Sequence, residues 1–397
     1  MAVILNFLQG KIFKFGLSIF FFFVLIFARS FMGVYIFGFR IGELLMLFSV
    51  LVLIYSIIFY SKIEILKEYV NQKTYYLLVT IVLSFFLLAL FSGSSFSSPY
   101  TYRSSSYIWT LGFFLLGIIF FEKNNLNLRY VYLLVASLAY VYLFAIYGLP
   151  ENITTFILSI SDKYEPHKGS DLLLVFISIF FIFNRLAENK RFALEVFILF
   201  SAAYFPLMLF KSRASFIGFL VYVIFELIYL RKYFRNALAR NFIVGIASIY
   251  LIFQSTFLVS GSGFLKTTQI QTEVEYVVTY RADPDDEVFR LFYIAEDILG
   301  SKTTRIFSSD NNLNWRLQIW QDVIYDLSNK NLFLLGYGYK DKIPAMLDEG
   351  RMGLDRLNEN VHNYLITIFA RGGFTSLVLI IMLYFFSIKR NIAINKT

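Results

Sequence analysis

The feature that most constrains this chain is a succession of long apolar runs without charge, separated by loops that hold most of the Lys and Arg residues. A helix needs about 20 apolar residues to cross roughly 30 Å of hydrocarbon. Only 16% of the residues are charged, whereas soluble domains are about a quarter charged. We therefore expect an all-α, polytopic transmembrane bundle. The runs predict about ten spans, at 12–36, 41–60, 75–91, 107–121, 129–149, 170–184, 192–210, 214–230, 241–259 and 361–387.

The charge of the loops gives the orientation of these spans. Cytoplasmic loops are enriched in Lys and Arg, and basic loops also attract the anionic headgroups of a lipid bilayer. The short loops on one side hold 17 basic residues, at 11, 14, 62, 67, 73, 123, 129, 185, 190, 191, 231, 232, 235, 240, 389, 390 and 396. Those on the other side hold six, at 40, 103, 163, 168, 211 and 213. The asymmetry places both termini in the cytoplasm.

Composition excludes several classes of site. The chain has no Cys, which rules out disulfides, thiolate nucleophiles and cysteine metal sites. Two histidines leave little for a histidine metal site, and the acidic run at 283–287 is a weak signal for a hard cation. We predict no metal and no cofactor. The basic residues are scattered and form no continuous patch, which argues against a nucleic-acid partner.

The longest polar segment is 260–360, which we predict to be a large extracytoplasmic loop inserted between the last two spans of a single membrane domain, 1–397. Loops of this length are usually functional. We expect one amphipathic helix in it, ending near 329–331 before a turn at 336–338, with Trp315 and Trp320 at headgroup level. Its apolar residues have helical spacing: Leu313, Leu317, Trp320, Ile324 and Leu327.

Two arginines are candidates for binding a phosphate-bearing substrate. Arg213 lies where the seventh span turns into the eighth, and its guanidinium is placed to clamp a diphosphate through paired N–H donors. The alternative is an arginine that reaches lipid phosphate. Arg316 stands beside the apolar stripe of the loop helix, where it would contact a phosphate or a sugar. Alternatively it pairs with a carboxylate such as Asp322 or Asp310, and the sequence alone favours that pair.

His362 and Asn363 begin the last span. Imidazole is suited to take a proton from a sugar hydroxyl near neutral pH, or it donates a hydrogen bond to a phosphate oxygen. The alternative is a polar pair that caps the helix. Arg371 would lie on the opposite face of a continuous helix. We therefore expect either a helix break near Gly372-Gly373 or a separate role for Arg371, in helix packing or a salt bridge.

Two residues of the outward loops are further candidate substrate contacts. Arg103 lies in a Ser/Tyr-rich loop, 92–106, and His167 lies near the end of the loop 150–169. For His167 the alternative is a position in a solvated loop.

Three segments, in this order, resemble the bacterial O-antigen ligase and O-antigen polymerase superfamily. They are Lys211-Ser212-Arg213, then Trp315-Arg316 running to Gly336-Tyr337-Gly338, then His362-Asn363-Tyr364-Leu365 running to Gly372-Gly373. The resemblance covers roughly 205–387. Many relatives carry an acidic residue shortly before the glycine that here follows Arg371, so no role is carried over to that position.

The resemblance implies a GT-C-type, metal-independent glycosyltransferase of the bacterial inner membrane. It would act at the periplasmic face on a glycan carried by undecaprenyl diphosphate. By analogy, Arg213 and Arg316 hold the diphosphate, and His362 assists the acceptor hydroxyl or the leaving group. His362 and Arg316 are thus the expected catalytic residues. The expected substrate-binding residues are Arg213, Asn363, Arg103 and His167.

Polymerase and ligase share this chemistry and differ in the acceptor. A polymerase adds glycan to another lipid-linked repeat unit, and a ligase adds it to the lipid A core. The modest span count and the individual composition of the loops favour the polymerase, with a chain-length regulator protein as a candidate partner. A third alternative is that the protein is a flippase for lipid-linked glycan. It predicts polar residues at mid-depth in several spans and pseudo-symmetric halves, whereas here the polar groups gather outside the spans.

Overall fold

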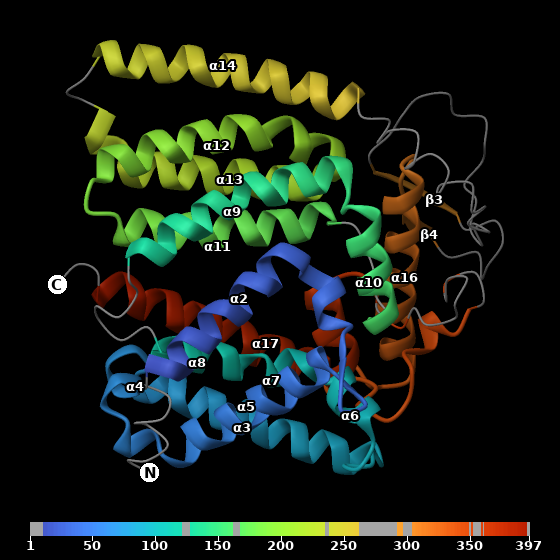
Figure 1. The fold of residues 1–397 in the computed structure, drawn as a ribbon. Helices are drawn as coiled ribbons and strands as arrows, with labels where there is room; N and C mark the ends of the chain where they lie inside the picture. The colour runs from blue at the N-terminus through green and yellow to red at the C-terminus, as the bar shows by residue number, and fades with distance from the viewer. Residues whose placement is uncertain are drawn as a thin grey trace. The chain divides into compact units, whose positions relative to one another are not determined.

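The computed structural model describes residues 11–120, 128–161, 167–234, 238–261, 292–296, 304–348, 351, 359 and 361–394. These residues form a fold that is almost entirely helical, with strands confined, in the described ranges, to two hairpins (Figure 1). Contacts divide the chain into two compact units. Unit 1 comprises 1–45 and 123–273, and unit 2 comprises 46–122 and 274–397.

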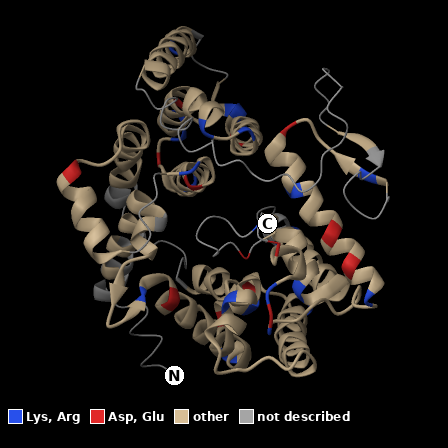
Figure 2. Cartoon of the chain, turned by 90° about the vertical axis from the view of Figure 1, so that its right-hand side faces the viewer, with Lys and Arg blue, Asp and Glu red and all other residues tan. Residues whose placement is uncertain are grey.

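The expected all-α polytopic architecture is confirmed. Seven described helices are long and apolar enough to cross a membrane, or eight if the bent pair Tyr132–Tyr147 and Glu151–Ile160 is one span. Figure 2 shows the low charge of these helices, since Lys, Arg, Asp and Glu occupy few segments of ribbons that are otherwise tan. The seven are Ile41–Ile58, Gln72–Phe91, Gly169–Leu186, Lys190–Lys211, Arg213–Phe234, Ala239–Gly261 and Tyr364–Arg390.

The sequence predicts about ten spans, which is more than the seven or eight among the described helices. The first expected span corresponds to a helix, Lys11–Met32, that leaves helical geometry at Ala28, where φ is 43° and ψ is −120°. The fourth corresponds to a shorter apolar stretch, Ser106–Ile119. Both apolar runs are therefore helical. They differ from the continuous spans because the first contains a backbone break and the fourth is short.

Unit 1 is built around α11, which packs against α9, α12 and α13, while α14 packs on α12. Phenylalanine rings from α11, α12 and α13 fill its core, among them Phe176, Phe180, Phe197 and Phe219. Its elements are α2 (Lys11–Met32), β1 (Tyr35–Ile36), β2 (Phe39–Arg40), α9 (Leu128–Tyr147), α10 (Glu151–Ile160), α11 (Gly169–Leu186), α12 (Lys190–Lys211), α13 (Arg213–Leu230), η2 (Arg231–Phe234) and α14 (Leu238–Gly261).

Unit 2 pairs α17 with α5 and α4, and α16 packs on α17, β4 and η3. Ile319, Val323 and Leu327 of α16 share a core with Phe369 and Ala370 of α17. Its elements are most of α3 (Ile41–Ile58), η1 (Tyr60–Lys62), α4 (Glu64–Tyr69), α5 (Gln72–Phe91), α6 (Pro99–Ser104), α7 (Ser106–Trp109), α8 (Leu111–Phe120), β3 (Tyr293–Glu296), β4 (Thr304–Phe307), α16 (Asn311–Asn329), η3 (Pro344–Met346) and α17 (Tyr364–Ile394).

The expected helix of the long loop is α16, and its two ends have clear causes. The Asp310 carboxylate accepts a hydrogen bond from the Leu313 N–H at 2.9 Å, which satisfies a donor of the first turn. At the other end Asn331 has φ 56°, and the Leu332 N–H donates to the Leu327 carbonyl at 2.9 Å. This is a Schellman ending with Asn in the left-handed position.

The buried face of α16 differs from the expected stripe. Ile319 and Val323 are fully buried together with Leu327, whereas Ile324 is exposed. The indole N–H of Trp320 donates to a backbone carbonyl of the protein, so this ring does not act only as a headgroup anchor. The helix was predicted correctly, and its orientation about its axis was not.

A break in α17 receives the glycine turn of the loop. Gly373 has φ 65° and ψ −170° inside the helix. The N–H groups of Tyr337 and Gly338 donate to the carbonyls of Ala370 and Arg371 at 2.8 and 2.9 Å. A Cβ at Gly373 would lie 2.2 Å from the Leu334 carbonyl oxygen, so the close approach requires glycine. The break expected near Gly372-Gly373 is therefore present, and the loop segment 333–338 fills it.

Candidate functional site

His362 occupies a tight turn between the long loop and α17. Its φ is 53°, a left-handed conformation that is uncommon for a residue other than glycine and that concentrates at functional sites. The side chain is exposed, and its ring lies against the indole of Trp315, with ring centroids 4.9 Å apart. The Trp320 indole N–H donates to the Val361 carbonyl at 2.7 Å. Two tryptophans of α16 thus fix the turn that presents the imidazole.

Asn363 is the N-cap of α17. Its side-chain oxygen accepts hydrogen bonds from the N–H groups of Leu365 at 3.0 Å and Ile366 at 3.2 Å. The capping alternative is therefore correct for Asn363. Because the oxygen is used by the helix, the amide N–H donors of this side chain are the part suited to a ligand.

Arg316 has no hydrogen bond or ion pair with any residue that the structure describes. Its Nε atom is buried and lacks an acceptor there, although the side chain as a whole is half-buried. The alternative pairing with Asp322 is wrong, because that carboxylate binds Arg305 and Arg351 instead. Arg316 directly follows Trp315, so it is held beside the His362 turn. A guanidinium with a donor that no described residue uses suits an anionic ligand.

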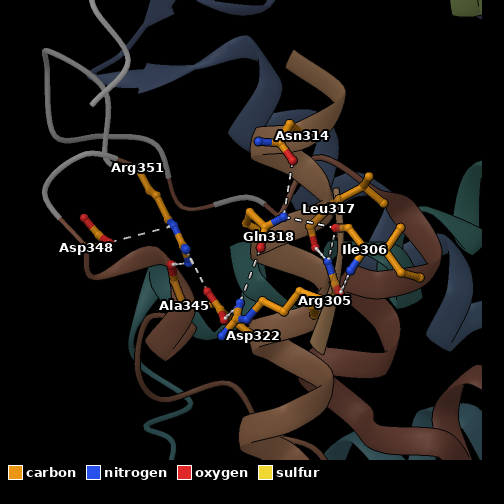
Figure 3. A network of polar contacts seen from close by, with 10 residues as sticks. Arg305, Ile306, Asn314, Leu317, Gln318, Asp322, Ala345, Asp348 and Arg351 are labelled. Carbon is orange, nitrogen blue, oxygen red and sulfur yellow. Dashed lines mark hydrogen bonds and ion pairs between the residues drawn. The ribbon is translucent and has the colours of Figure 1, made fainter. Parts of the chain in front are cut away.

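The carboxylate of Asp322 joins three segments of unit 2 (Figure 3). Arg305 of β4 contacts it at 2.6 Å, and Arg351, whose side chain is 4% exposed, contacts it at 2.7 Å. Gln321 adds a second connection, since its amide donates to the Ile306 carbonyl and accepts from the Ile306 N–H, both at 2.8 Å. These contacts fix α16, and with it Arg316, against β4 and the segment around η3.

Tyr337 connects the glycine turn to the same helix. Its phenol donates to Asp326 at 2.7 Å. Burial, followed by this hydrogen bond to a carboxylate, raises the pKa of Tyr337, so the phenol stays a neutral donor at physiological pH. The turn that fills the α17 break is thus bonded to α17 through its backbone and to α16 through this side chain.

Arg103 lies at the end of α6 and pairs with Glu359, three residues before His362. Lys342 contacts the other oxygen of the same carboxylate at 3.2 Å. The Arg103 guanidinium is exposed and lies over the Tyr100 ring, 5.3 Å from its centroid. The structure therefore brings Arg103 to the segment that leads into His362, where a carboxylate and a second cation accompany it.

Arg371 is 3% exposed, and its partners are neutral oxygens. It donates to the Asp341 carbonyl at 2.6 Å, the Gly338 carbonyl at 3.2 Å and the Tyr100 hydroxyl at 2.6 Å. This arrangement confirms the expectation of a packing role for Arg371, through hydrogen bonds to loop and phenol oxygens. An intramembrane cation is tolerated when such partners satisfy it.

Arg213 and His167 lie together in unit 1. Arg213 is the exposed first residue of α13, directly after the N-cap Ser212. His167 comes directly before the start of α11, and a Cβ at Gly169 would lie 2.8 Å from the Cβ of Ser212. The starts of α11 and α13 therefore touch, and both candidate residues are at the same end of unit 1.

The imidazole of His167 is buried, 2% exposed, with its ring edge-on to Phe144 at a centroid distance of 4.8 Å. The alternative of a solvated loop is therefore wrong. Neither ring nitrogen has a hydrogen-bond partner among the described residues. Burial lowers the pKa of His167 from 6.5 to about 4, and the nearby Leu25 carbonyl and the Asp171 carboxylate oppose this only in part. His167 is neutral at physiological pH, so it does not act as a cationic phosphate ligand in this conformation.

Of the six expected site residues, unit 2 holds Arg103, Arg316, His362 and Asn363, and unit 1 holds Arg213 and His167. Sequence reasoning missed the residues that place them: Tyr100 and Trp315 as ring partners, Trp320 as the donor to the Val361 carbonyl, and Glu359 as the partner of Arg103. The sequence predicts both Trp residues as anchors at headgroup level and not as supports of the His362 turn. No local spacing links Tyr100 or Glu359 to the site, since their partners come from distant parts of the chain.

Comparison with protein families gives one match. Residues 196–381 match the family model described as O-antigen ligase. No curated protein and no solved structure matched the chain. The matched region contains Arg213, Arg316 and His362, which are the residues on which the resemblance in the sequence depended. Residues 196–381 are thus similar to the O-antigen ligase family, which supports the resemblance to the O-antigen ligase and O-antigen polymerase superfamily.

Proposed function

We propose that this protein is a glycosyltransferase of surface polysaccharide synthesis that acts as an O-antigen polymerase. It takes a glycan from an undecaprenyl diphosphate carrier and joins it to a second lipid-linked repeat unit, at the periplasmic face of the bacterial inner membrane. The family match and the apolar helices support the membrane enzyme. The excess of basic residues in one set of short loops supports the orientation.

The observation that carries the proposal is the position of Arg316 directly after Trp315, whose ring contacts His362. The guanidinium lacks a partner among the described residues. Protein cations without an internal partner are costly unless a ligand or solvent satisfies them. A diphosphate supplies acceptor oxygens that match the fork of N–H donors.

The proposed reaction is a displacement at the anomeric carbon of the donor sugar. The acceptor hydroxyl oxygen forms the new bond to this carbon, and the bond from the carbon to the diphosphate oxygen breaks with its electron pair. His362 accepts the hydroxyl proton. Arg316 binds the diphosphate and stabilises the negative charge that grows on it, the kind of stabilisation that usually contributes most to such reactions.

The remaining expected residues take supporting roles in this proposal. Asn363 offers its amide N–H donors to a sugar hydroxyl while its oxygen caps α17. Arg103 is exposed beside Glu359 and contacts the glycan. His167, neutral and buried, lines the end of unit 1 where α13 begins. A chain-length regulator protein is a further proposed partner.

Deletion of the gene, followed by electrophoresis of the surface polysaccharide, tests the proposal. Loss of a polymerase leaves single repeat units on the lipid A core. Loss of a ligase leaves a bare core and accumulated lipid-linked polymer, which would assign the alternative activity. Complementation with the wild-type gene should restore the ladder of chain lengths. An unchanged polysaccharide in the deletion strain would overturn both assignments.

A further inference from the structure

One helix of unit 1 lies across the others. α9 has 20 residues, a length of about 30 Å that already covers the hydrocarbon core. The α10 helix follows it after a bend of 91°, and Figure 1 shows α10 running across the ends of its neighbours in unit 1. If α9 crosses the bilayer, α10 lies parallel to the membrane surface at the level where α9 ends.

The two faces of α10 differ in chemistry. Ile153, Phe156, Ile157 and Ile160 follow helical spacing and form one apolar stripe, from which Leu158 is excluded. Only Ile157 is buried; Phe156 is 63% exposed, and its two Ile neighbours on the stripe are exposed as well. Glu151, Thr155 and Ser159 occupy the opposite side. An amphipathic helix with an uncovered apolar stripe is typical of a helix lying in a membrane interface.

A second apolar element is tied to the end of this helix. The β1–β2 hairpin turns through Phe37 and Gly38, whose φ angles are 53° and 83°, the left-handed pair required by a two-residue hairpin turn. Phe37 is 96% exposed at its tip. Ser161, directly after α10, pairs with Val34 before the hairpin and donates from its hydroxyl to the Ser30 carbonyl at 2.8 Å.

We propose that the α10–hairpin surface, formed by Tyr35–Phe39 and by the apolar stripe of α10, inserts into the headgroup layer and upper acyl chains of the leaflet in which α9 ends. The occupant of this surface is lipid. The argument is its continuity with α9, which the sequence predicts to span the membrane over 129–149, because a surface joined to the end of that span by a right-angled bend is at the depth of the headgroups.

The side chains around this surface suit that depth. Arg40 donates to the Tyr35 hydroxyl at 3.2 Å, so a cation and a phenol stand at the base of the hairpin, and both side chains favour the membrane–water interface. Phe37 at the tip would transfer its ring from water into acyl chains, and removing this apolar surface from water stabilises the inserted state.

The start of α11 follows α10 after the segment 161–168, and Arg213 begins the helix that touches it. Resting on the proposed function, the inserted surface would hold this end of unit 1 at the level where the diphosphate of a lipid carrier lies. The insertion itself does not depend on that function, so the two are tested separately.

The chain contains no cysteine, so single nitroxide labels can be attached to otherwise native protein in liposomes of phosphatidylethanolamine and phosphatidylglycerol. Phe37→Cys and Phe156→Cys probe the apolar surface, with Ile36→Cys and Ile153→Cys as second positions if a first variant fails to fold. Thr155→Cys and Ser159→Cys are matched controls on the polar side of α10. Leu143→Cys, on the exposed side of α9 about one turn before its end, gives a reference inside the hydrocarbon.

Accessibility of each label to oxygen and to a water-soluble nickel chelate gives its depth. We expect the ratio of oxygen access to nickel-chelate access to be several-fold higher for the apolar-surface labels than for the control labels. The ratio should be lower for the apolar-surface labels than for the label at 143. Water-like values at 37 and 156 would overturn the proposal. Oxygen-rich values on both sides of α10 would show a continuing span instead, and low access to both reagents at 37 and 156 would show that protein covers the surface.

Discussion

The imidazole ring of His362 and the indole ring of Trp315 have their centroids 4.9 Å apart, at an interplanar angle of 56°. This contact joins the turn before α17 to the first half of α16, so the position of the imidazole depends on a helix of the preceding loop. A second indole, that of Trp320, holds the same turn through the Val361 carbonyl. The start of α16 and the turn at His362, which are distant in the sequence, are thus joined by direct contacts.

Trp320→Phe should lower the rate of glycan transfer by roughly 10-fold without a comparable change in the KM for donor, because it leaves the buried Val361 carbonyl without its donor and loosens the His362 turn. Steady-state kinetics with purified lipid-linked donor measure this. Tyr325→Phe, which removes an exposed hydroxyl from the same helix, is the matched control and should behave as wild type. A wild-type kcat in Trp320→Phe would show that the turn needs no such support.

Arg316→Ala should reduce transfer by roughly 100-fold, the size expected when a group that stabilises transition-state charge is removed. The thermal unfolding midpoint should stay unchanged, since the guanidinium has no partner among the described residues. Lys330→Ala removes a cation from the end of α16 that pairs only with Asp326 among those residues and should keep its activity. Retained activity in Arg316→Ala would remove this residue from the mechanism.

Arg351→Ala should destabilise unit 2 by about 3 kcal/mol, because it leaves the Asp322 carboxylate with one of its two cations and breaks a pair in which the arginine is buried. Lys330→Ala breaks an exposed pair and should cost about 0.5 kcal/mol or less. Thermal unfolding in detergent compares the two. Equal effects would mean that the Asp322 contacts do not hold α16 in place.

Gly373→Ala should destabilise the protein by at least about 2 kcal/mol, since alanine is strained at φ 65° and its Cβ would meet the Leu334 carbonyl at 2.2 Å. Gly245→Ala is the matched control within a helix. A Cβ there has no neighbour within 4 Å, so the change should be neutral or stabilising. Similar unfolding midpoints for both variants would contradict the account of the α17 break.

His167 predicts a pH dependence of stability. Its pKa is about 4 in the folded protein and 6.5 when exposed, so the folded state resists protonation. The stability of unit 1 is complete above pH 6.5 and falls as the pH is lowered toward 4, by about 3 kcal/mol in total. His167→Leu should lessen this dependence, while His362→Gln, which leaves the buried imidazole in place, should retain it. Unfolding midpoints of the wild type and both variants, measured between pH 7.5 and 4.5, test this prediction.

The sequence predicted those features that depend on local chemistry. Asn331 marks the end of α16, which the sequence predicts near 329–331, because capping uses neighbouring backbone groups, and the pair Gly372-Gly373 marks the break in α17. The axial orientation of α16 could not be predicted, because it depends on Gln321 and Asp322 binding β4 and Arg351. The same limit applies to Arg371, whose phenol partner is Tyr100, 271 positions away.

The glycine turn that fills the break in α17 has a consequence for biogenesis. Its backbone partners are residues 370 and 371 of the final helix, which leave the ribosome after the whole loop has been made. The loop is therefore synthesised before its own acceptors exist, and the turn at His362 is fixed only once α17 has been made. A chain that stops before residue 370 would lack the carbonyls that hold the glycine turn.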